Sequence, residues 1–361
     1  MAVRFVYVRR ALGAAGALLA TAGLAGTASM TPHALPSSLY THPARLVAID
    51  GARRLNLLCV GSGEPAVIFE AGLGDRTTVW RFVQGQAGSV TRACSYDRAG
   101  YGFSDPPAGA SDAAHTVRDL HALLAAAGFT KPVVLVGHSI GGLYATLYAD
   151  RYPAQVAGMV LVDPSFAHQE AALTGDIGTA GRRRYAGYVE AEEAQLTACL
   201  ALARSGALAA PSKAQAAKCL QRDPGPEHFD AALLHEFNVL KAKPVTIETV
   251  LSELHSFHAD AKHADADSVE LDAAQRNFGA TPLVILTAGN LAHGAALPGF
   301  TKAQGLAFGR AWVVGHDRLA ARSSRGSNTI VEGSGHYIEV DRPQRVIAAI
   351  QSVVSAVRAA P

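Results

Sequence analysis

The sequence predicts an α/β protein in which buried parallel strands alternate with helices. Residues 133–136 are apolar and three of the four are β-branched, which is typical of a buried parallel strand, and residues 143–149 have the composition of a helix. Further short apolar runs alternate with helical periodicity on both sides of this unit. A chain of 361 residues exceeds one typical domain, so we expect either one large core with an insertion or two domains.

Between that strand and that helix lies the pattern G-x-S-x-G, formed by Gly137, Ser139 and Gly141. Glycine and serine also occur in ordinary loops, so the pattern alone indicates little. A strand directly before it and a helix directly after it make it a nucleophile elbow, a sharp turn that exposes a reactive serine hydroxyl above the sheet. Ser139 is therefore the candidate nucleophile.

Four strands are expected before the elbow. Runs 45–50 and 54–60 flank the turn signal Asp50-Gly51, and run 65–70 leads into a glycine-containing loop. Run 90–96 is the fourth. Residues 111–128 follow as an amphipathic helix that ends at a glycine.

After the elbow and its helix, the next expected strand is 156–162. From 166 to 278 the pattern changes to alanine-rich helical runs with few β-branched stretches, which predicts a helical cap inserted after the sixth strand. The strand pattern returns at 282–287 and 328–331. The remaining expected helices are 303–321 and 342–358, the second with an apolar face toward the sheet.

The N-terminus has the features of a targeting segment. Basic residues precede the apolar run 11–26, and small residues end at Ala28, so we expect a signal peptide over 1–28 and an exported protein, periplasmic or secreted. A retained membrane anchor is the alternative, although the run is short against the ~20 residues of a span. Arg9-Arg10 leaves a twin-arginine signal open.

Exported proteins reach oxidising compartments in which cysteines form disulfides. The four cysteines of this chain allow three pairings. We favour a disulfide between Cys199 and Cys219. Cys59 and Cys94 pair only if their strands are neighbours, and buried free thiols are the alternative.

The composition is ordinary for a soluble enzyme. Hydrophobic residues make up 49%, charged residues 17%, and the formal net charge is +2, without a basic stripe for nucleic acid or an anionic membrane. His255 and His258 share a helical face, but no further ligand pattern accompanies them, so we expect no metal and no cofactor.

Three motifs together resemble the α/β-hydrolase superfamily, specifically its capped serine hydrolases and esterases of exported bacterial type. They are the run Asp97-Arg98-Ala99-Gly100-Tyr101-Gly102-Phe103-Ser104-Asp105, the elbow, and Gly333-Ser334-Gly335-His336. The resemblance implies an eight-stranded, mostly parallel sheet with helices on both faces, formed by 40–165 and 279–361, with 166–278 as the cap. Asp97, Arg98 and Ser104 are expected to be structural, since a buried turn needs its charges paired.

The resemblance also assigns the catalytic roles. His336 occupies the position of the general base, and the backbone amides of Leu73 and Ile140 occupy the positions of the oxyanion hole. The usual position of the acid, after the penultimate strand, fails because no Asp or Glu occurs from 281 to 316. Asp163, at the end of the strand that follows the elbow helix, resembles the alternative position and is our choice.

Two alternatives for the acid remain open at this stage. Asp317 is the first acidic residue after the gap, but it lies in an expected helix and is expected to be solvated. Asn290 is an unusual candidate for the same role. Asp163 followed by proline is also common in relatives where it serves structure alone.

The expected function is hydrolysis of an ester or related acyl bond through an acyl-enzyme intermediate, with a small or medium apolar acyl substrate. Peptidases, lactonases and perhydrolases share the triad, and a ligand-binding protein with slow or no turnover is the alternative of another class. Haloalkane dehalogenases and epoxide hydrolases carry aspartate at the elbow, where this chain has Ser139. Candidates for an apolar pocket lining are Phe166, Tyr185, Tyr188, Phe229, Phe237 and Phe257.

Overall fold

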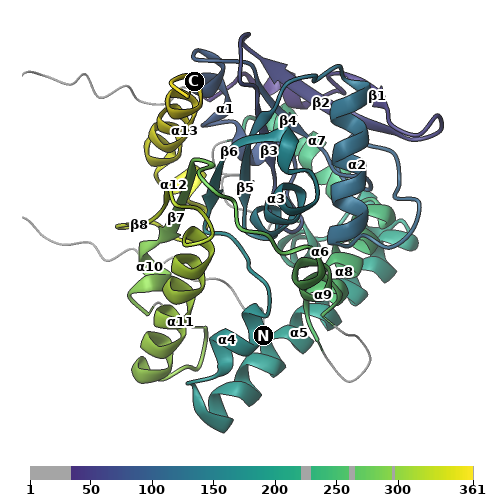
Figure 1. Cartoon of the computed structure of the whole chain (residues 1–361). Helices are drawn as coiled ribbons and strands as arrows, with labels where there is room; N and C mark the ends of the chain where they lie inside the picture. Colours follow the sequence, from purple (N-terminus) through teal and green to yellow (C-terminus); the bar gives the residue numbers. More distant parts are fainter. Residues whose placement is uncertain (1–33, 221–228, 260–264, 295–296, 361) are drawn as a thin grey trace, which may run out of the picture.

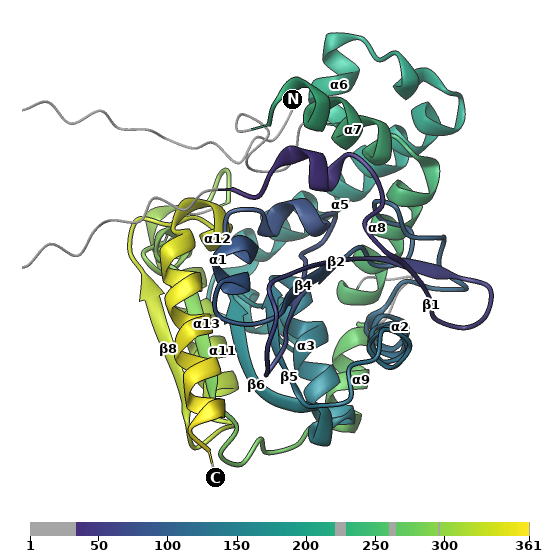
Figure 2. The ribbon, with the colours of Figure 1, turned by 90° about the horizontal axis from the view of Figure 1, so that it is seen from above.

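The computed structural model of this chain describes residues 34–220, 229–259, 265–294 and 297–360, and the structural statements below refer to these residues. The expected signal peptide over 1–28 lies outside the described residues. Figure 1 shows the chain from one side of its central sheet, and Figure 2 shows it from above.

The centre of the molecule is an eight-stranded sheet with the strand order β1-β2-β4-β3-β5-β6-β7-β8. β2 runs antiparallel to β1 and β4, and all other neighbouring pairs are parallel. The predicted α/β class and its eight strands are thereby confirmed. The strands are β1 (Leu46–Ala48), β2 (Arg54–Val60), β3 (Val67–Glu70), β4 (Ala93–Tyr96), β5 (Val133–His138), β6 (Val156–Val162), β7 (Leu283–Ala288) and β8 (Gly326–Val331).

Helices cover both faces of the sheet because each carries an apolar stripe toward it. On one face lie α2 (Ala113–Ala126), α3 (Ile140–Arg151) and the end of α11 (Lys302–Ala320). On the other lie α1 (Gln84–Gly88) and α13 (Pro343–Arg358), so that β5 and β6 separate α13 from α2 and α3 (Figure 2). Two short helices, α10 (Gly289–Ala292) and α12 (Ile338–Asp341), follow β7 and β8. Single 3-10 turns lie at η1 (Ser37–Tyr40), η2 (Thr77–Trp80), η3 (Pro153–Gln155) and η4 (Ala207–Ala209).

The segment between β6 and β7 is helical, and α4, α5, α8 and α9 lie together below the sheet in Figure 1. The last of these helices, α9, packs against α2 and α3, and its Leu271 belongs to the main apolar core. The last helix of the segment, α9, is therefore packed on the core, although it precedes β7 in the chain. Its helices are α4 (Gln169–Thr174), α5 (Gly178–Arg204), α6 (Lys213–Cys219), α7 (Ala231–Lys241), α8 (Pro244–Phe257) and α9 (Ala266–Ala274).

All four cysteines form disulfides. The predicted pair Cys199–Cys219 is confirmed and joins α5 to the end of α6. Cys59 and Cys94 are also bonded, because β2 and β4 are neighbours and the two residues face each other in their register. The alternative of free thiols for this second pair was wrong.

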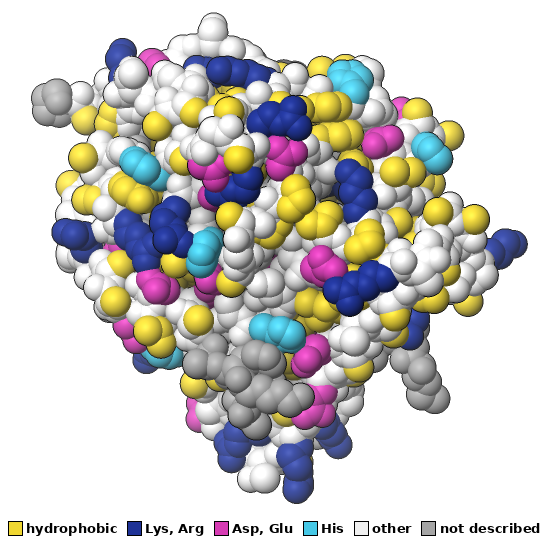
Figure 3. Space-filling view, turned by 90° about the vertical axis from the view of Figure 1, so that its right-hand side faces the viewer, with side chains coloured by type: hydrophobic (Ala, Val, Ile, Leu, Met, Phe, Trp, Pro, Cys, Tyr) yellow, Lys and Arg dark blue, Asp and Glu magenta, His cyan; other side chains and the backbone are white. Residues whose placement is uncertain are grey.

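The surface in Figure 3 intersperses basic, acidic and apolar side chains and has no stripe of a single charge. Among the described residues, no helix is both long and apolar enough to cross a bilayer. The same residues contain no cluster of three or more His, Cys, Asp or Glu side chains arranged to hold a metal ion.

Candidate active site

The elbow after β5 has the geometry that its sequence predicts. Ser139 adopts φ 54° and ψ −126°, a strained conformation for a residue with a side chain, and α3 begins at the next residue. The N–H groups in the first turn of a helix have no partner within it, so the Ile140 amide and the positive end of the helix dipole lie beside Ser139. Ser139 itself is partly exposed.

The elbow requires glycine at Gly137 and Gly141, because neighbouring backbone lies too close to leave space for a side chain. A Cβ on Gly141 would lie 2.4 Å from the Ala71 carbonyl oxygen, and one on Gly137 would lie 2.5 Å from the Gly141 carbonyl oxygen. The first turn of α3 therefore packs directly on the end of β3. Since β3 and β5 are parallel neighbours, with Glu70 opposite Gly137, the loop after β3 and the elbow leave the sheet at the same edge.

That loop contains Leu73, the other expected oxyanion donor, and Leu73 is partly exposed. The structure therefore brings the segments of both expected donors, Leu73 and Ile140, into contact at the carboxyl edge of the sheet. Two backbone amides can form an oxyanion hole only where their segments lie this close together.

Asp163 and His336 are in direct contact. Asp163 Oδ2 lies 2.6 Å from His336 Nδ1, and the carboxylate is fully buried at the end of β6. Its other oxygen, Oδ1, accepts hydrogen bonds from the Trp312 indole N–H at 2.7 Å and from the Ala288 amide at 2.8 Å. With three donors around it, the carboxylate has one fixed orientation.

Burial raises the pKa of Asp163, but the hydrogen bond and charge of His336, the charge of His316 and the Ala288 hydrogen bond outweigh burial, so the pKa is lowered below its ordinary value. Asp163 is therefore ionised at neutral pH. An ionised acceptor at Nδ1 keeps a proton on that nitrogen and leaves Nε2 of His336 as the basic one.

The two alternative acids lie elsewhere. Asp317 is exposed on α11, where its Oδ1 accepts a hydrogen bond from Asn328 Nδ2 at 2.8 Å. Asn290 lies in α10, and its backbone N–H donates to the Ser334 carbonyl. Of the three candidates, Asp163 is the one whose carboxylate contacts the His336 ring.

Three residues around His336 were not singled out from the sequence. The His138 ring packs 4.7 Å from the His336 ring, and its Nε2 lies 3.1 Å from the His336 carbonyl oxygen. Because a carbonyl only accepts, Nε2 carries the proton and Nδ1 of His138 is an acceptor, 3.3 Å from Oε1 of the buried Glu339. Burial raises the pKa of Glu339 well above its usual range, so a protonated carboxyl fits that position.

His138 precedes Ser139 in the chain, so its contact with His336 holds the elbow against the loop that carries His336. His138 stands inside the motif and was within reach of sequence reasoning. Trp312 and Glu339 had no such signal, because they lie on helices whose position only the fold determines.

Most of the aromatic side chains expected in a pocket lining belong to packed clusters. Phe166 and Tyr185 pack with Trp312 and Phe308 beside Asp163, and the Phe166 ring fills the space next to Gly315. Phe257 contacts the main core, and two further rings of the set lie against arginine side chains, Phe229 on Arg81 and Phe237 on Arg76.

Comparison with known protein families matches residues 65–195 to the family described as alpha/beta hydrolase fold. This range contains the loop after β3, the motif of 97–105 and the elbow. An uncharacterized protein of Bacillus subtilis strain 168, YqjL, is 33% identical over 105 residues, which are 29% of this chain and 42% of that protein. The chain thus spans less than half the length of this curated relative.

Solved structures resemble the chain over most of its length. A loop variant of the haloalkane dehalogenase DbeA from Bradyrhizobium elkanii matches with a TM-score of 0.63 at 14% identity, covering 87% of this chain and 97% of the other. The epoxide hydrolase CorEH matches with a TM-score of 0.57 at 19% identity, covering 86% and 98%. At these identities the likeness concerns the fold.

Proposed function

Because the chain belongs to the α/β-hydrolase superfamily, we propose that it is a serine hydrolase that cleaves an ester or related acyl bond. The observation that carries the proposal is the 2.6 Å contact between Asp163 and His336. His138, the residue before Ser139 in the elbow turn, holds the His336 backbone at 3.1 Å. Fold alone would not distinguish this function from that of the dehalogenase and epoxide hydrolase that it resembles. Ser139 at the elbow favours acyl transfer.

In the proposed reaction, His336 Nε2 takes the proton of Ser139 as Oγ attacks the acyl carbonyl carbon. The amides of Leu73 and Ile140 bind the oxyanion that develops on the carbonyl oxygen. His336 then gives the proton to the leaving oxygen as the acyl bond breaks. Water, activated by the same nitrogen, attacks the acyl-enzyme and releases the acid and free Ser139.

Asp163 stabilises the imidazolium and fixes its tautomer throughout these steps. We propose a small or medium apolar acyl ester as the substrate, enclosed by the helices of 166–278 as a cap. Two disulfides are typical of proteins of oxidising compartments and support an exported protein.

The test is labelling of the purified protein with a fluorophosphonate probe. We expect the wild type and Ser324→Ala to be labelled and Ser139→Ala to be unlabelled, with the thermal midpoint of Ser139→Ala within a few degrees of the wild type. Ser324 is an exposed loop serine and controls for nonspecific reaction. A series of p-nitrophenyl esters of rising chain length then measures the size of the pocket. A folded wild type that is not labelled would favour a ligand-binding protein instead.

A further inference from the structure

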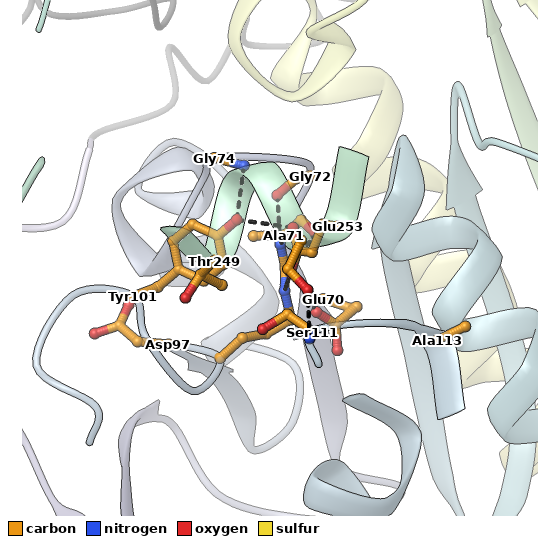
Figure 4. A network of polar contacts seen from close by, with 12 residues as sticks. Glu70, Ala71, Gly72, Gly74, Asp97, Tyr101, Ser111, Ala113, Thr249 and Glu253 are labelled. Carbon is orange, nitrogen blue, oxygen red and sulfur yellow. Dashed lines mark hydrogen bonds and ion pairs between the residues drawn. The ribbon is translucent and has the colours of Figure 1, made fainter. Parts of the chain in front are cut away.

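A buried polar network connects helix α8, within the segment of the proposed cap, to the loop after β3 (Figure 4). Glu253 of α8 and Glu70 at the end of β3 are both 1% exposed, and the Arg98 side chain between them is 4% exposed. Tyr101 is the fourth member and contacts Glu253 in the same figure. Charged groups so deeply buried are costly unless fully paired, so their partners show what the network holds in place.

All five N–H donors of Arg98 are used. Nε donates to Glu253 Oε1 at 2.9 Å, and Nη2 donates to Glu253 Oε2 at 3.1 Å. Nη1 donates to Glu70 Oε1 at 2.9 Å and to the Ala71 carbonyl at 2.6 Å, and the second proton of Nη2 goes to the Gly72 carbonyl at 2.8 Å. One guanidinium thus joins a carboxylate of α8 to two successive carbonyls of the loop.

The bond to the Gly72 carbonyl fixes the amide of Leu73. The two groups belong to one trans peptide unit, in which C=O and N–H point in opposite directions. With its carbonyl held by Arg98, the Gly72–Leu73 unit directs the Leu73 N–H away from the network. On the far side of Leu73, the Gly74 N–H donates to the Tyr101 hydroxyl at 3.3 Å, while that hydroxyl donates to Glu253 Oε2 at 2.7 Å.

We propose that Glu253 is a positioning residue for the oxyanion hole. Through Arg98 and Tyr101 it fixes the orientation of the Leu73 amide, so the docking of α8 and the orientation of this oxyanion donor are coupled. This inference rests on the proposed function. The arrangement ties the part of the molecule that encloses the substrate to the donor that stabilises the transition state.

Other contacts keep α8 seated when Glu253 is changed. Thr246 Oγ1 donates to the Gly100 carbonyl at 3.0 Å, and Thr249 occupies the space that a side chain on Gly100 would need. Replacement of Glu253 by glutamine keeps the shape but puts an amide NH₂ where Arg98 or Tyr101 needs an acceptor. The guanidinium then loses its orientation while the helix stays in place.

The experiment compares the wild type, Glu253→Gln and Glu248→Gln. Glu248 lies on the same helix but is exposed and pairs with Arg204, so it is the matched control. With a p-nitrophenyl ester, we expect kcat of Glu253→Gln to fall roughly 10- to 100-fold with little change in KM, less than the loss of a whole oxyanion donor. The control is expected to stay within twofold.

A second readout separates positioning from general damage. A trifluoromethyl ketone binds as a hemiketal whose oxyanion needs the hole, whereas the matching methyl ketone binds without it. We expect Glu253→Gln to lose roughly 10-fold or more of the preference for the fluorinated ketone, and Tyr101→Phe to lose several-fold. If Glu253→Gln still reacts with the fluorophosphonate and its preference for the fluorinated ketone is unchanged, this inference is overturned while the proposed function stands.

If Glu253→Gln does not fold, Tyr101→Phe decides, and an unchanged preference in that variant overturns the inference. A folded wild type that neither reacts with the fluorophosphonate nor cleaves the ester overturns the proposed function, and this inference with it.

Discussion

Asp163 combines two tasks in one carboxylate. Oδ1 is occupied by the Trp312 and Ala288 donors, which hold the end of β6 to β7 and α11, and Oδ2 is turned to His336. Its backbone has φ 44°, the second strained residue of the site after Ser139. Strain at two residues of one site is typical of a functional centre that the surrounding fold keeps in place.

Replacement of Asp163 by asparagine separates these tasks. Asparagine Oδ1 can keep both donors, so the fold is retained, but its NH₂ group then donates to His336 Nδ1 and moves the imidazole proton to Nε2. Nε2 can then no longer accept the Ser139 proton, and we expect kcat to fall roughly 10³- to 10⁴-fold. Steady-state kinetics on the best p-nitrophenyl ester measures this.

The matched control is Asp317→Asn, which changes an exposed carboxylate bonded to Asn328 and is expected to leave kcat within twofold. If Asp317→Asn were the more damaging of the two, the assignment of the acid to Asp163 would be wrong.

At the scale of elements, α9 is docked on the core by a buried acid. Asp267 is fully buried, and it accepts hydrogen bonds from the Ala113 amide at the start of α2 at 2.8 Å and from the Ser256 hydroxyl of α8 at 3.1 Å. Burial, opposed by these two hydrogen bonds, raises its pKa from 3.8 to about 7. The carboxyl joins three helices, and its ionisation state therefore affects their docking.

This shift predicts a pH dependence of stability. The folded state binds the proton more tightly than the unfolded state, so the stabilisation is complete below about pH 4 and is lost as pH rises through 7. Asp267→Asn removes this dependence and keeps the bond from Ala113. Between pH 5 and pH 8 the wild type loses this stabilisation and Asp267→Asn does not. The difference in free energy of unfolding between variant and wild type should therefore shift in favour of the variant by on the order of 2 kcal/mol.

Urea unfolding at the two pH values measures the gain. Glu270→Gln, on the same helix but partly exposed and paired with Arg151, should show no such change between pH 5 and pH 8. An equal pH response of the wild type and Asp267→Asn would contradict the shift.

At the scale of the whole molecule, the two disulfides stabilise different parts. Cys59–Cys94 joins two strands of the sheet, whereas Cys199–Cys219 joins α5 and α6 in a segment with its own small apolar cluster. A small apolar cluster buries little surface, so Cys199–Cys219 contributes a larger share of the stability of its segment than Cys59–Cys94 contributes to that of the sheet.

Removal of the second disulfide by the double substitution Cys199→Ser, Cys219→Ser should destabilise the protein. Closure of a loop with a sequence separation of 20 corresponds to about 3 kcal/mol in the unfolded-chain entropy model. Calorimetry should show a thermal midpoint several degrees lower, or an earlier separate transition of this segment. An unchanged midpoint, with the loss of the disulfide verified by mass spectrometry, would contradict the expected contribution.

The sequence by itself determined the strands and the elbow, and it favoured the pairing of Cys199 with Cys219. These are local properties: β-branched runs define buried strands, and glycines around Ser139 mark a turn that only they permit. The family resemblance pointed to Asp163 for the acid, since no acidic residue occurs from 281 to 316 at the family's usual position, but it left Asp317 and Asn290 open.

The tertiary structure decided what depends on contacts between segments far apart in the chain. It brought Asp163 to His336 across 173 positions, and it made β2 and β4 neighbours, which bonds Cys59 to Cys94. Arg98 was expected to be structural, but its partner Glu253 lies 155 positions away. Nothing local marks such a pair, since a single glutamate on an amphipathic helix is ordinary until the fold buries it against its cation.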